Sequence, residues 1–277
     1  MTELNVRNYS VLMTVYINDE LSHVFLAIKS ILEQSLATND FIIVADGPLR
    51  PEVHDCIVSM KLKFDIINYQ IIKNNVGLGN ALQYGLKFAD NNIIMRMDAD
   101  DYSEPERAEK LLKLMTENVV VVGSYIGEFI ENPNESLSII KYKKNITNFD
   151  IKNYYRDPVG HASVMFNKNA VLDAGGYLDC LYFEDTYLWL RIAKKSIGKF
   201  VNSDEVLYKA RIGNGFYSRR SGHKYLIIEM KNFIRFYKEN LISFHSFLIN
   251  ILLRPFFRLL PKNYISIFYK KFLRSKS

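Results

Sequence analysis

The sequence contains little cysteine and no long apolar run. Its two cysteines, Cys56 and Cys180, are too few for a disulfide framework and lack the spacing of metal ligands. The N-terminal residues show no basic segment followed by a long apolar run, so no signal peptide is predicted. No stretch reaches the roughly 18–20 apolar residues that are needed to span a bilayer. With 48% apolar and 24% charged residues among 277, we expect a folded protein of the reducing cytoplasm.

Several nucleotide-binding and catalytic motifs are also missing. The glycine-rich run at 74–85 ("NNVGLGNALQYG") has neither the G-x-G-x-x-G fingerprint nor a Walker lysine, which excludes a dinucleotide site and a P-loop. Its Gly77 and Gly79 instead allow a tight entry into a following helix. No Ser/His/Asp or Cys/His pattern accompanies His161, which argues against hydrolase chemistry of those kinds.

A regular alternation of apolar strands and amphipathic helices is present up to about residue 130. Strands are predicted at 9–16, 41–47, 66–74, 93–101 and 119–130, and helices at 20–36, 52–64, 78–89 and 104–118. This order predicts an α/β fold with a parallel sheet flanked by helices. Because the strands are nearly all apolar, the helices should cover both faces of the sheet.

The alternation becomes irregular in the rest of the chain. Strands are predicted at 138–144, 163–168 and 199–213, and a helix at 184–196 that opens with two acidic residues. That acid pair, Glu184 and Asp185, has two interpretations. It can cap the helix N-terminus, or it can supply a general base for an incoming hydroxyl group.

Three acidic residues end the predicted strand "IIMRMDADD": Asp98, Asp100 and Asp101. Ligands of open α/β sheets bind beyond the carboxyl ends of the strands, and Asp46 ends another predicted strand. Divalent cations such as Mg²⁺ and Mn²⁺ prefer carboxylate oxygens and are often shared with substrate phosphates. The alternatives without a functional role are a solvated acidic turn for Asp98-Ala99-Asp100 (D-x-D) and an ordinary strand-to-turn residue for Asp46. The position at strand ends favours a metal and nucleotide site.

These segments together resemble the family 2 glycosyltransferases of the GT-A fold, in particular the small bacterial members that build surface glycans. The resemblance rests on "VADG", on the run that ends in "DADD", and on "HASVMF" followed by "FEDTYLWLRI". It covers roughly residues 9–225. It implies a catalytic domain at 1–216, with a nucleotide-sugar-binding half at 1–130 and an acceptor-side half at 131–216.

The resemblance also implies roles for individual residues. The residues implied for binding the nucleotide sugar are Thr14, Tyr16, Asp46, Asp98, Arg219 and Arg220. Those implied for the metal are Asp100, Asp98 and His223. The catalytic base would be Asp185, with Glu184 as the alternative, and His161 would lie on the acceptor side. The two arginines belong to a Gly- and Arg-rich segment whose composition is that of a loop closing over phosphates, or of a solvated linker.

The activity that the resemblance implies is an inverting, metal-dependent sugar transfer. A cofactor of Mn²⁺ or Mg²⁺ would offset the repulsion of the acids and neutralise charge on the leaving diphosphate. The donor would be a nucleotide sugar, in particular a UDP-sugar, and the acceptor a hydroxyl group of a lipid-linked or protein-linked glycan. Because the Q-x-x-R-W signature of processive synthases is absent, one sugar per acceptor is expected.

The C-terminal segment 217–277 differs from the rest in charge. It holds 13 Lys and Arg against two acids, a net charge of +11, whereas the remaining residues sum to −5. Three interpretations stay open: a membrane-surface helix, which would place the protein at the inner face of the cell membrane; a helical pair that packs on the core or in a homo-oligomer; and, as a different function, nucleic-acid binding. The acidic strand ends disfavour nucleic acid. Pro255 and Pro261 are expected to break this segment into short helices.

Overall fold

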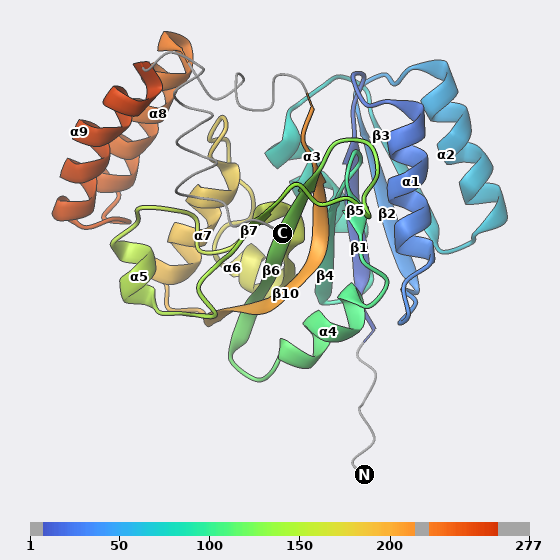
Figure 1. Ribbon diagram of the computed structural model, residues 1–277, viewed down its shortest axis with the longest axis horizontal. Coiled ribbons are helices and arrows are strands. Elements are labelled where there is room, and N and C mark those ends of the chain that lie inside the picture. Colours follow the sequence, from blue (N-terminus) through green and yellow to red (C-terminus); the bar gives the residue numbers. More distant parts are fainter. Residues whose placement is uncertain (1–7, 214–221, 260–277) are drawn as a thin grey trace.

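The computed structural model describes residues 8–213 and 222–259 (Figure 1). One sheet runs through the middle of the molecule, with α1 and α2 on one flank and the α8–α9 pair at the opposite edge. Arg219 and Arg220, together with the final 18 residues of the basic segment, lie outside the described residues.

The first half of the chain confirms the predicted alternation. Its elements are β1 (Ser10–Val15), α1 (Leu21–Leu32), β2 (Asp40–Asp46), α2 (Pro51–Lys63), β3 (Ile67–Ile72), α3 (Leu78–Gly85), β4 (Ile93–Asp98), β5 (Tyr102–Ser103), α4 (Arg107–Leu114) and β6 (Val119–Phe129). Helix α1 ends earlier than expected. After it, Gln34 bonds to the carbonyl of Glu104 at 2.8 Å and Ser35 N to that of Pro105 at 2.8 Å, so this stretch turns toward α4.

The second half contains several elements that the sequence did not predict. In chain order the elements are β7 (Ser138–Ile140), β8 (Asn145–Ile146), α5 (Asn148–Lys152), β9 (Met165–Asn167), α6 (Lys168–Asp173), α7 (Glu184–Lys194), β10 (Lys199–Arg211), α8 (His223–Lys238) and α9 (Phe244–Leu259). The unpredicted β5, β8, α5 and α6 have two to six residues each, too few to leave a recognisable periodicity.

The sheet order is β3-β2-β1-β4-β9-β6-β10-β5. Strands β3, β2, β1 and β4 are parallel, as are β6 and β10. The sheet is therefore mostly parallel, which confirms the predicted α/β fold; the antiparallel members of this order are β9, which pairs with both β4 and β6, and β5, which pairs with β10. The short β9 therefore separates β3, β2, β1 and β4 from β6, β10 and β5 in the sheet.

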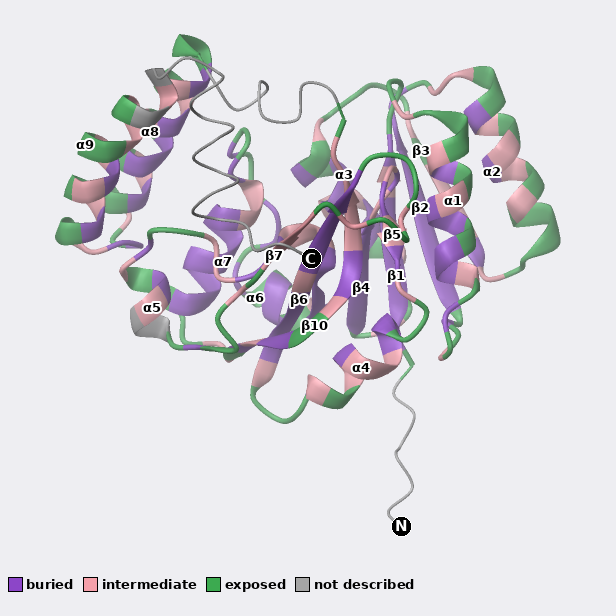
Figure 2. Cartoon of the chain, viewed as in Figure 1, coloured by how far each residue is buried: buried purple, intermediate pink, exposed green. Residues whose placement is uncertain are grey.

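Helices cover both faces of the sheet, as expected (Figure 2). Alternate residues of β1 point to opposite cores: Leu12 packs with α3 and α7, and Val11 and Met13 pack with α1, α2 and α4. Burial of this much aliphatic surface, at roughly 25 cal/mol per Å², is the main force that holds the layers together.

The predicted break at Pro255 is wrong, because α9 continues through it to Leu259. Proline removes one helical hydrogen bond. The turns on either side are held by Arg254 and Arg258, which both bond to Glu229 of α8. Tertiary contacts therefore override the local preference, while Pro261 lies outside the described residues. Among the helices that the structure describes, none is both long and apolar enough to cross a membrane.

Candidate active site

The carboxyl ends of β1, β2 and β4 meet at one edge of the sheet. Thr14 of β1 is in register with Asp98 of β4 on one side and with Val44 of β2 on the other. Tyr16 is the first residue after β1, and 37% of its surface is exposed. The register therefore brings three of the predicted nucleotide-site residues, Thr14, Tyr16 and Asp98, to the same edge.

Asp98 is held by an arginine that the sequence analysis missed. Arg96, two residues earlier on β4, donates from Nη1 to Asp98 Oδ2 at 2.8 Å and from Nη2 to Oδ1. Its side chain is buried at 2% exposure. Burial lowers the pKa of Arg96, but the carboxylate of Asp98 outweighs this and raises it above the ordinary value. Arg96 therefore stays protonated, and its two hydrogen bonds fix both oxygens of Asp98 in one orientation.

Asp101, the third acid of the run, fastens the turn to the sheet. Tyr208 Oη donates to its Oδ2 at 2.7 Å and Arg211 N to its Oδ1 at 2.7 Å, and the side chain is buried. Burial and then the charges of Asp100 and Asp98 raise its pKa well above the ordinary value. Arg211 Nε also donates to the Asp100 carbonyl at 2.9 Å. Asp101 thus shapes the turn that presents Asp100.

The residues present fit a cation that is shared with a diphosphate. Mg²⁺ and similar ions are commonly bound by one or two carboxylates together with substrate phosphates. The half-buried Asp98 and Asp100 supply such a pair. Within residues 8–213 and 222–259 no group of three or more His, Cys, Asp or Glu could hold a metal ion by itself. His223, the first residue of α8, is therefore not brought into a preformed three-ligand site with the two aspartates.

A further carboxyl group, Asp19, shares this electrostatic environment. Its pKa is raised to about 7, chiefly by burial; the Tyr16 N–H opposes the shift, and the charges of Asp100 and Asp98 add to it. Tyr16 N donates to Asp19 Oδ2 at 2.9 Å. The sequence analysis missed Asp19, although its place in the short segment between β1 and α1 was a usable signal. The region concentrates negative charge that a bound cation would relieve.

Asp46 anchors the glycine-rich loop. Its carboxylate accepts from Val76 N at 2.7 Å, Gly77 N at 3.0 Å and Asn75 Nδ2 at 3.0 Å, and it is 5% exposed. The next residue, Gly47, has φ of 88°, and a Cβ there would lie 2.8 Å from Asn75 N. The structure thus gives Asp46 a clear part in shaping the loop between β3 and α3, at the edge where the nucleotide is expected.

The two candidates for the catalytic base, Glu184 and Asp185, are the first residues of α7, as the sequence indicated. Glu184 packs against α3: a Cβ on Gly79 would lie 2.8 Å from Glu184 Cγ. Burial is the main cause that raises the pKa of Glu184. The half-buried Asp185 accepts from Thr186 N at 2.7 Å. The N-terminal ends of α3 and α7 therefore lie against each other, with Glu184 between them.

His161 and Tyr177 connect the two groups of acids. His161 Nε2 and Tyr177 Oη are 2.9 Å apart. Burial and then the charge of Arg96 lower the pKa of His161 well below its ordinary value, so the imidazole is neutral near pH 7. The pKa of Tyr177 is raised by burial, and among further causes the charges of Asp185 and Asp98 raise it. The sequence analysis placed His161 on the acceptor side but gave no signal for Tyr177.

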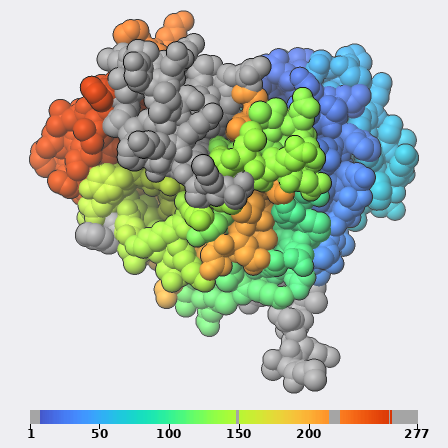
Figure 3. All heavy atoms as spheres, in the orientation of Figure 1, coloured from blue at the N-terminus to red at the C-terminus, as the bar shows by residue number. Residues whose placement is uncertain are grey.

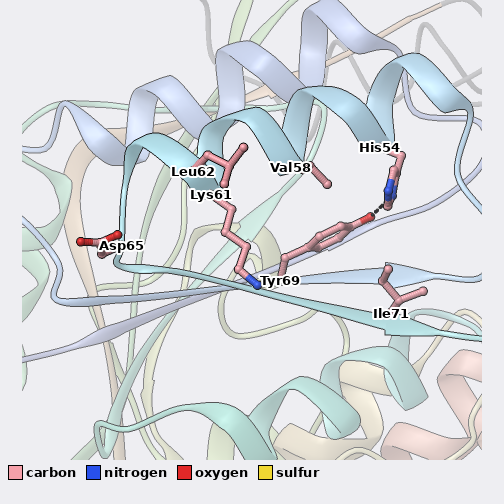
Figure 4. A pocket seen from close by; sticks show the side chains of 7 residues that line it. All are labelled: His54, Val58, Lys61, Leu62, Asp65, Tyr69 and Ile71. Atoms are coloured by element: carbon pink, nitrogen blue, oxygen red, sulfur yellow. Dashed lines mark hydrogen bonds between the residues drawn. The ribbon is translucent and has the colours of Figure 1, made fainter.

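A surface hollow of about 490 Å³ lies elsewhere, between α2 and β3 (Figure 4). Its lining residues are His54, Val58, Lys61, Leu62, Asp65, Tyr69 and Ile71. His54 Nδ1 and Tyr69 Oη, 3.1 Å apart, bond across it. None of the residues of the strand-end site lines this hollow.

A mixed, mostly parallel sheet with paired acids at the carboxyl end of β4 defines the GT-A class of glycosyltransferases. Two solved structures share this fold. A UDP-GlcNAc complex of S. aureus TarS gives a TM-score of 0.67 at 16% identity, over 90% of this chain and 72% of that chain. Mannosyltransferase PcManGT from Pyrobaculum calidifontis, in complex with GDP-Man and Mn²⁺, gives 0.65 at 15% identity, over 90% and 71%.

The chain belongs to glycosyl transferase family 2, whose family model matches residues 10–172. It is 35% identical to the UDP-Gal:alpha-D-GlcNAc-diphosphoundecaprenol beta-1,3-galactosyltransferase of Escherichia coli, over 96% of each chain. It is 31% identical to the amylovoran biosynthesis glycosyltransferase AmsE of Erwinia amylovora, over 95% of this chain and 98% of that protein. Family membership confirms the glycosyltransferase interpretation over the nucleic-acid-binding alternative.

Proposed function

We propose that the protein transfers one sugar from a UDP-sugar, with inversion, to a hydroxyl group of a lipid-linked glycan in bacterial surface glycan biosynthesis. The observation that carries this proposal is the arrangement of two acid pairs. Asp98 and Asp100 end β4, and Glu184 and Asp185 open α7. The charges of Asp98 and Asp185 both act on Tyr177. One pair suits the diphosphate side of a donor and the other an acceptor hydroxyl.

The names of the relatives support the choice of substrates. The E. coli relative is a transferase from UDP-Gal to an undecaprenol-linked GlcNAc diphosphate, and this chain covers 96% of it. The Erwinia relative acts in amylovoran biosynthesis. We therefore take UDP-galactose as the first donor to test and a polyprenyl-diphosphate-linked GlcNAc as the first acceptor.

On the donor side, the nucleotide would lie along the carboxyl edge of β1, β2 and β4. Thr14 and Tyr16 would flank it, the loop that Asp46 anchors would contact the base or ribose, and Arg219 and Arg220 would bind the phosphates. Asp100 and Asp98 would hold Mn²⁺ or Mg²⁺. When bound, this ion supplies charge neutralisation on the departing diphosphate.

On the acceptor side, Asp185 would take the proton of the acceptor hydroxyl. The oxygen then attacks the anomeric carbon from the face opposite the diphosphate, so one displacement inverts the configuration. Glu184 is the less suitable base because it packs between α7 and α3. The neutral His161, which bonds to Tyr177, would fix that side chain on the acceptor side of the site without adding a charge there.

The test is a panel of UDP-, GDP- and dTDP-sugars with the polyprenyl-diphosphate-linked GlcNAc acceptor. We expect UDP release from UDP-galactose that requires acceptor and divalent metal, and a product that carries one added sugar by mass spectrometry. NMR of the product should show a β-linkage from the α-configured donor. Full activity in EDTA, a retained α-linkage, or a ladder of added sugars would each contradict one part of the proposal.

A further inference from the structure

Helix α8 carries an exposed row of alternating basic and apolar residues. Its members are Lys224, Ile227, Lys231, Ile234 and Lys238, at successive spacings of three and four residues. Ile227 is 55% exposed and Ile234 is 41% exposed. The opposite side of the helix packs on the body of the protein through Phe233 and Phe236. A spacing of three and four residues places the whole row on one side of the helix.

Helix α9 carries a second exposed row, which is apolar. It consists of Phe244, Leu248, Leu252 and Phe256, four residues apart, with exposures from 42% to 65%. The opposite side is polar and turned inward: Ser246 Oγ and Asn250 Nδ2 both donate to the Tyr154 carbonyl, at 2.6 and 2.8 Å. The inward side of this helix is thus partly polar, with Phe247 and Ile251 also packed on the core, while four large apolar side chains form an exposed row.

The acidic residues of this helix pair are neutralised within it. Glu229 has no exposed side-chain surface and binds Arg254 at 2.6 Å and Arg258 at 2.8 Å. Glu239 bonds to Arg235 at 2.9 Å and to Tyr187 Oη at 2.8 Å. Within residues 222–259 these are the only acids, so the lysines of α8 are not balanced by an exposed carboxylate that lacks an arginine partner.

We propose that the exposed rows of α8 and α9, here called the hairpin face, form a docking surface for an anionic lipid bilayer. The two helices form the outer edge of the molecule (Figures 1 and 3). Aromatic and aliphatic side chains enter the boundary between headgroups and acyl chains, and lysines bind the anionic headgroups. The 18 residues after α9 add five Lys and Arg and no acid, so the charge continues in the same sign along the chain.

The positive charge of the hairpin face favours an anionic bilayer over a second copy of the chain as its binding partner. A twofold dimer through this face would bring the same surfaces together, and the three lysines of one copy would meet those of the other. An anionic membrane turns the same charges into attraction. The inference does not depend on the sugar transfer, although a membrane-bound enzyme would meet a lipid-linked acceptor in the plane where it resides.

The experiment is cosedimentation of the full chain with vesicles of phosphatidylcholine, with and without phosphatidylglycerol. Two variants test the rows separately: Leu252→Glu with Phe256→Glu, and Lys224→Glu with Lys231→Glu and Lys238→Glu. We expect the wild type to bind only the anionic vesicles at low salt. Each variant should bind at least about tenfold more weakly, because each lysine near an anionic surface typically contributes on the order of 1 kcal/mol.

Matched controls lie on the other flank. Leu62 of α2 is 82% exposed, so Leu62→Glu changes an apolar surface residue outside the hairpin face. Lys61→Glu, Lys63→Glu and Lys87→Glu together give the same change in net charge as the α8 variant. Both controls should bind like the wild type. The proposal is overturned if the wild type binds neither kind of vesicle, if the controls weaken binding as much as the hairpin variants, or if ultracentrifugation shows a dimer that the hairpin variants abolish in the absence of lipid.

Discussion

The strand-end site and the α8–α9 helix pair each hold an acid against arginine, but the buried partner differs. At the site the buried partner is the arginine: 3% of the Arg96 side chain is exposed, against 30% of Asp98. In the helix pair the buried partner is the acid: Glu229 has no exposed side-chain surface, and the two arginines that meet it, Arg254 and Arg258, are 19% and 11% exposed. The partner that stays accessible has the sign that suits the ligand we propose for each region, a cation with a diphosphate at the carboxylates and an anionic surface at the basic helix pair.

The largest expected effect comes from removing the carboxylate charge of Asp100 at the site. Asp100→Asn should lower kcat/KM by about a thousandfold, because the charge that holds the cation against the diphosphate is lost. Metal titration of the variant, measured by UDP release, checks this, and circular dichroism should show an unchanged fold. Wild-type turnover of Asp100→Asn in EDTA would remove the metal from the proposal.

The acid pair at α7 tests whether the two sides of the site act independently. Asp185→Asn should lower kcat by about 10²–10⁴-fold, the range of a general base, because the acceptor hydroxyl keeps its proton. Calorimetry should still show donor binding, since Asp185 lies on the acceptor side. A variant that binds no UDP-sugar, or that keeps its full rate, would transfer the role to Glu184.

Breaking the buried pairing of the helix pair should affect stability and leave chemistry intact. Glu229→Gln leaves two largely buried arginines without a counter-charge and should lower the free energy of unfolding by about 3 kcal/mol, the lower end for a buried pair. Urea denaturation measures this. Glu239→Gln is the matched control: its side chain is 37% exposed, and it should cost at most about 1 kcal/mol. Equal losses in both would show that burial of Glu229 has no special weight.

The same residue has a defined pH dependence. Burial would raise the pKa of Glu229, but the hydrogen bond and charges of Arg258 and Arg254 lower it below the ordinary value. A lowered pKa stabilises the folded state above the unfolded value of about 4.3 and loses this contribution as the pH falls through the folded value. The difference between wild type and Glu229→Gln should therefore shrink below about pH 4, as urea unfolding at several pH values would show.

The sequence predicted the elements whose apolar patterns extend over many residues, and it failed where an element is short or depends on distant partners. Six-residue, mostly apolar strands such as β1 and β4 were predictable, and with them the position of Asp98 at a strand end. The three-residue β9 was predicted only as part of a longer strand, and its antiparallel pairing depends on distant partners on β4 and β6. Arg96 gave no usable signal, because one arginine inside an apolar strand does not reveal which carboxylate it will meet. Pro255 misled because the arginines that hold its helix act through tertiary contacts.

The smallest effect, and the sharpest test of the comparison, concerns Arg96 itself. Arg96→Lys keeps the charge but cannot hold both oxygens of Asp98, so that carboxylate loses its fixed orientation. We expect kcat/KM to fall by about tenfold, mainly through a higher KM for the UDP-sugar, and the metal concentration for half-maximal rate to rise. A merely structural role would lower the melting temperature without changing the metal concentration required.

A double-mutant cycle with Asp98→Asn distinguishes the two roles. If Arg96 acts through Asp98, then Arg96→Lys should change little in the Asp98→Asn background. Independent, multiplying losses would show that Arg96 acts on the donor by another route than its pairing with Asp98.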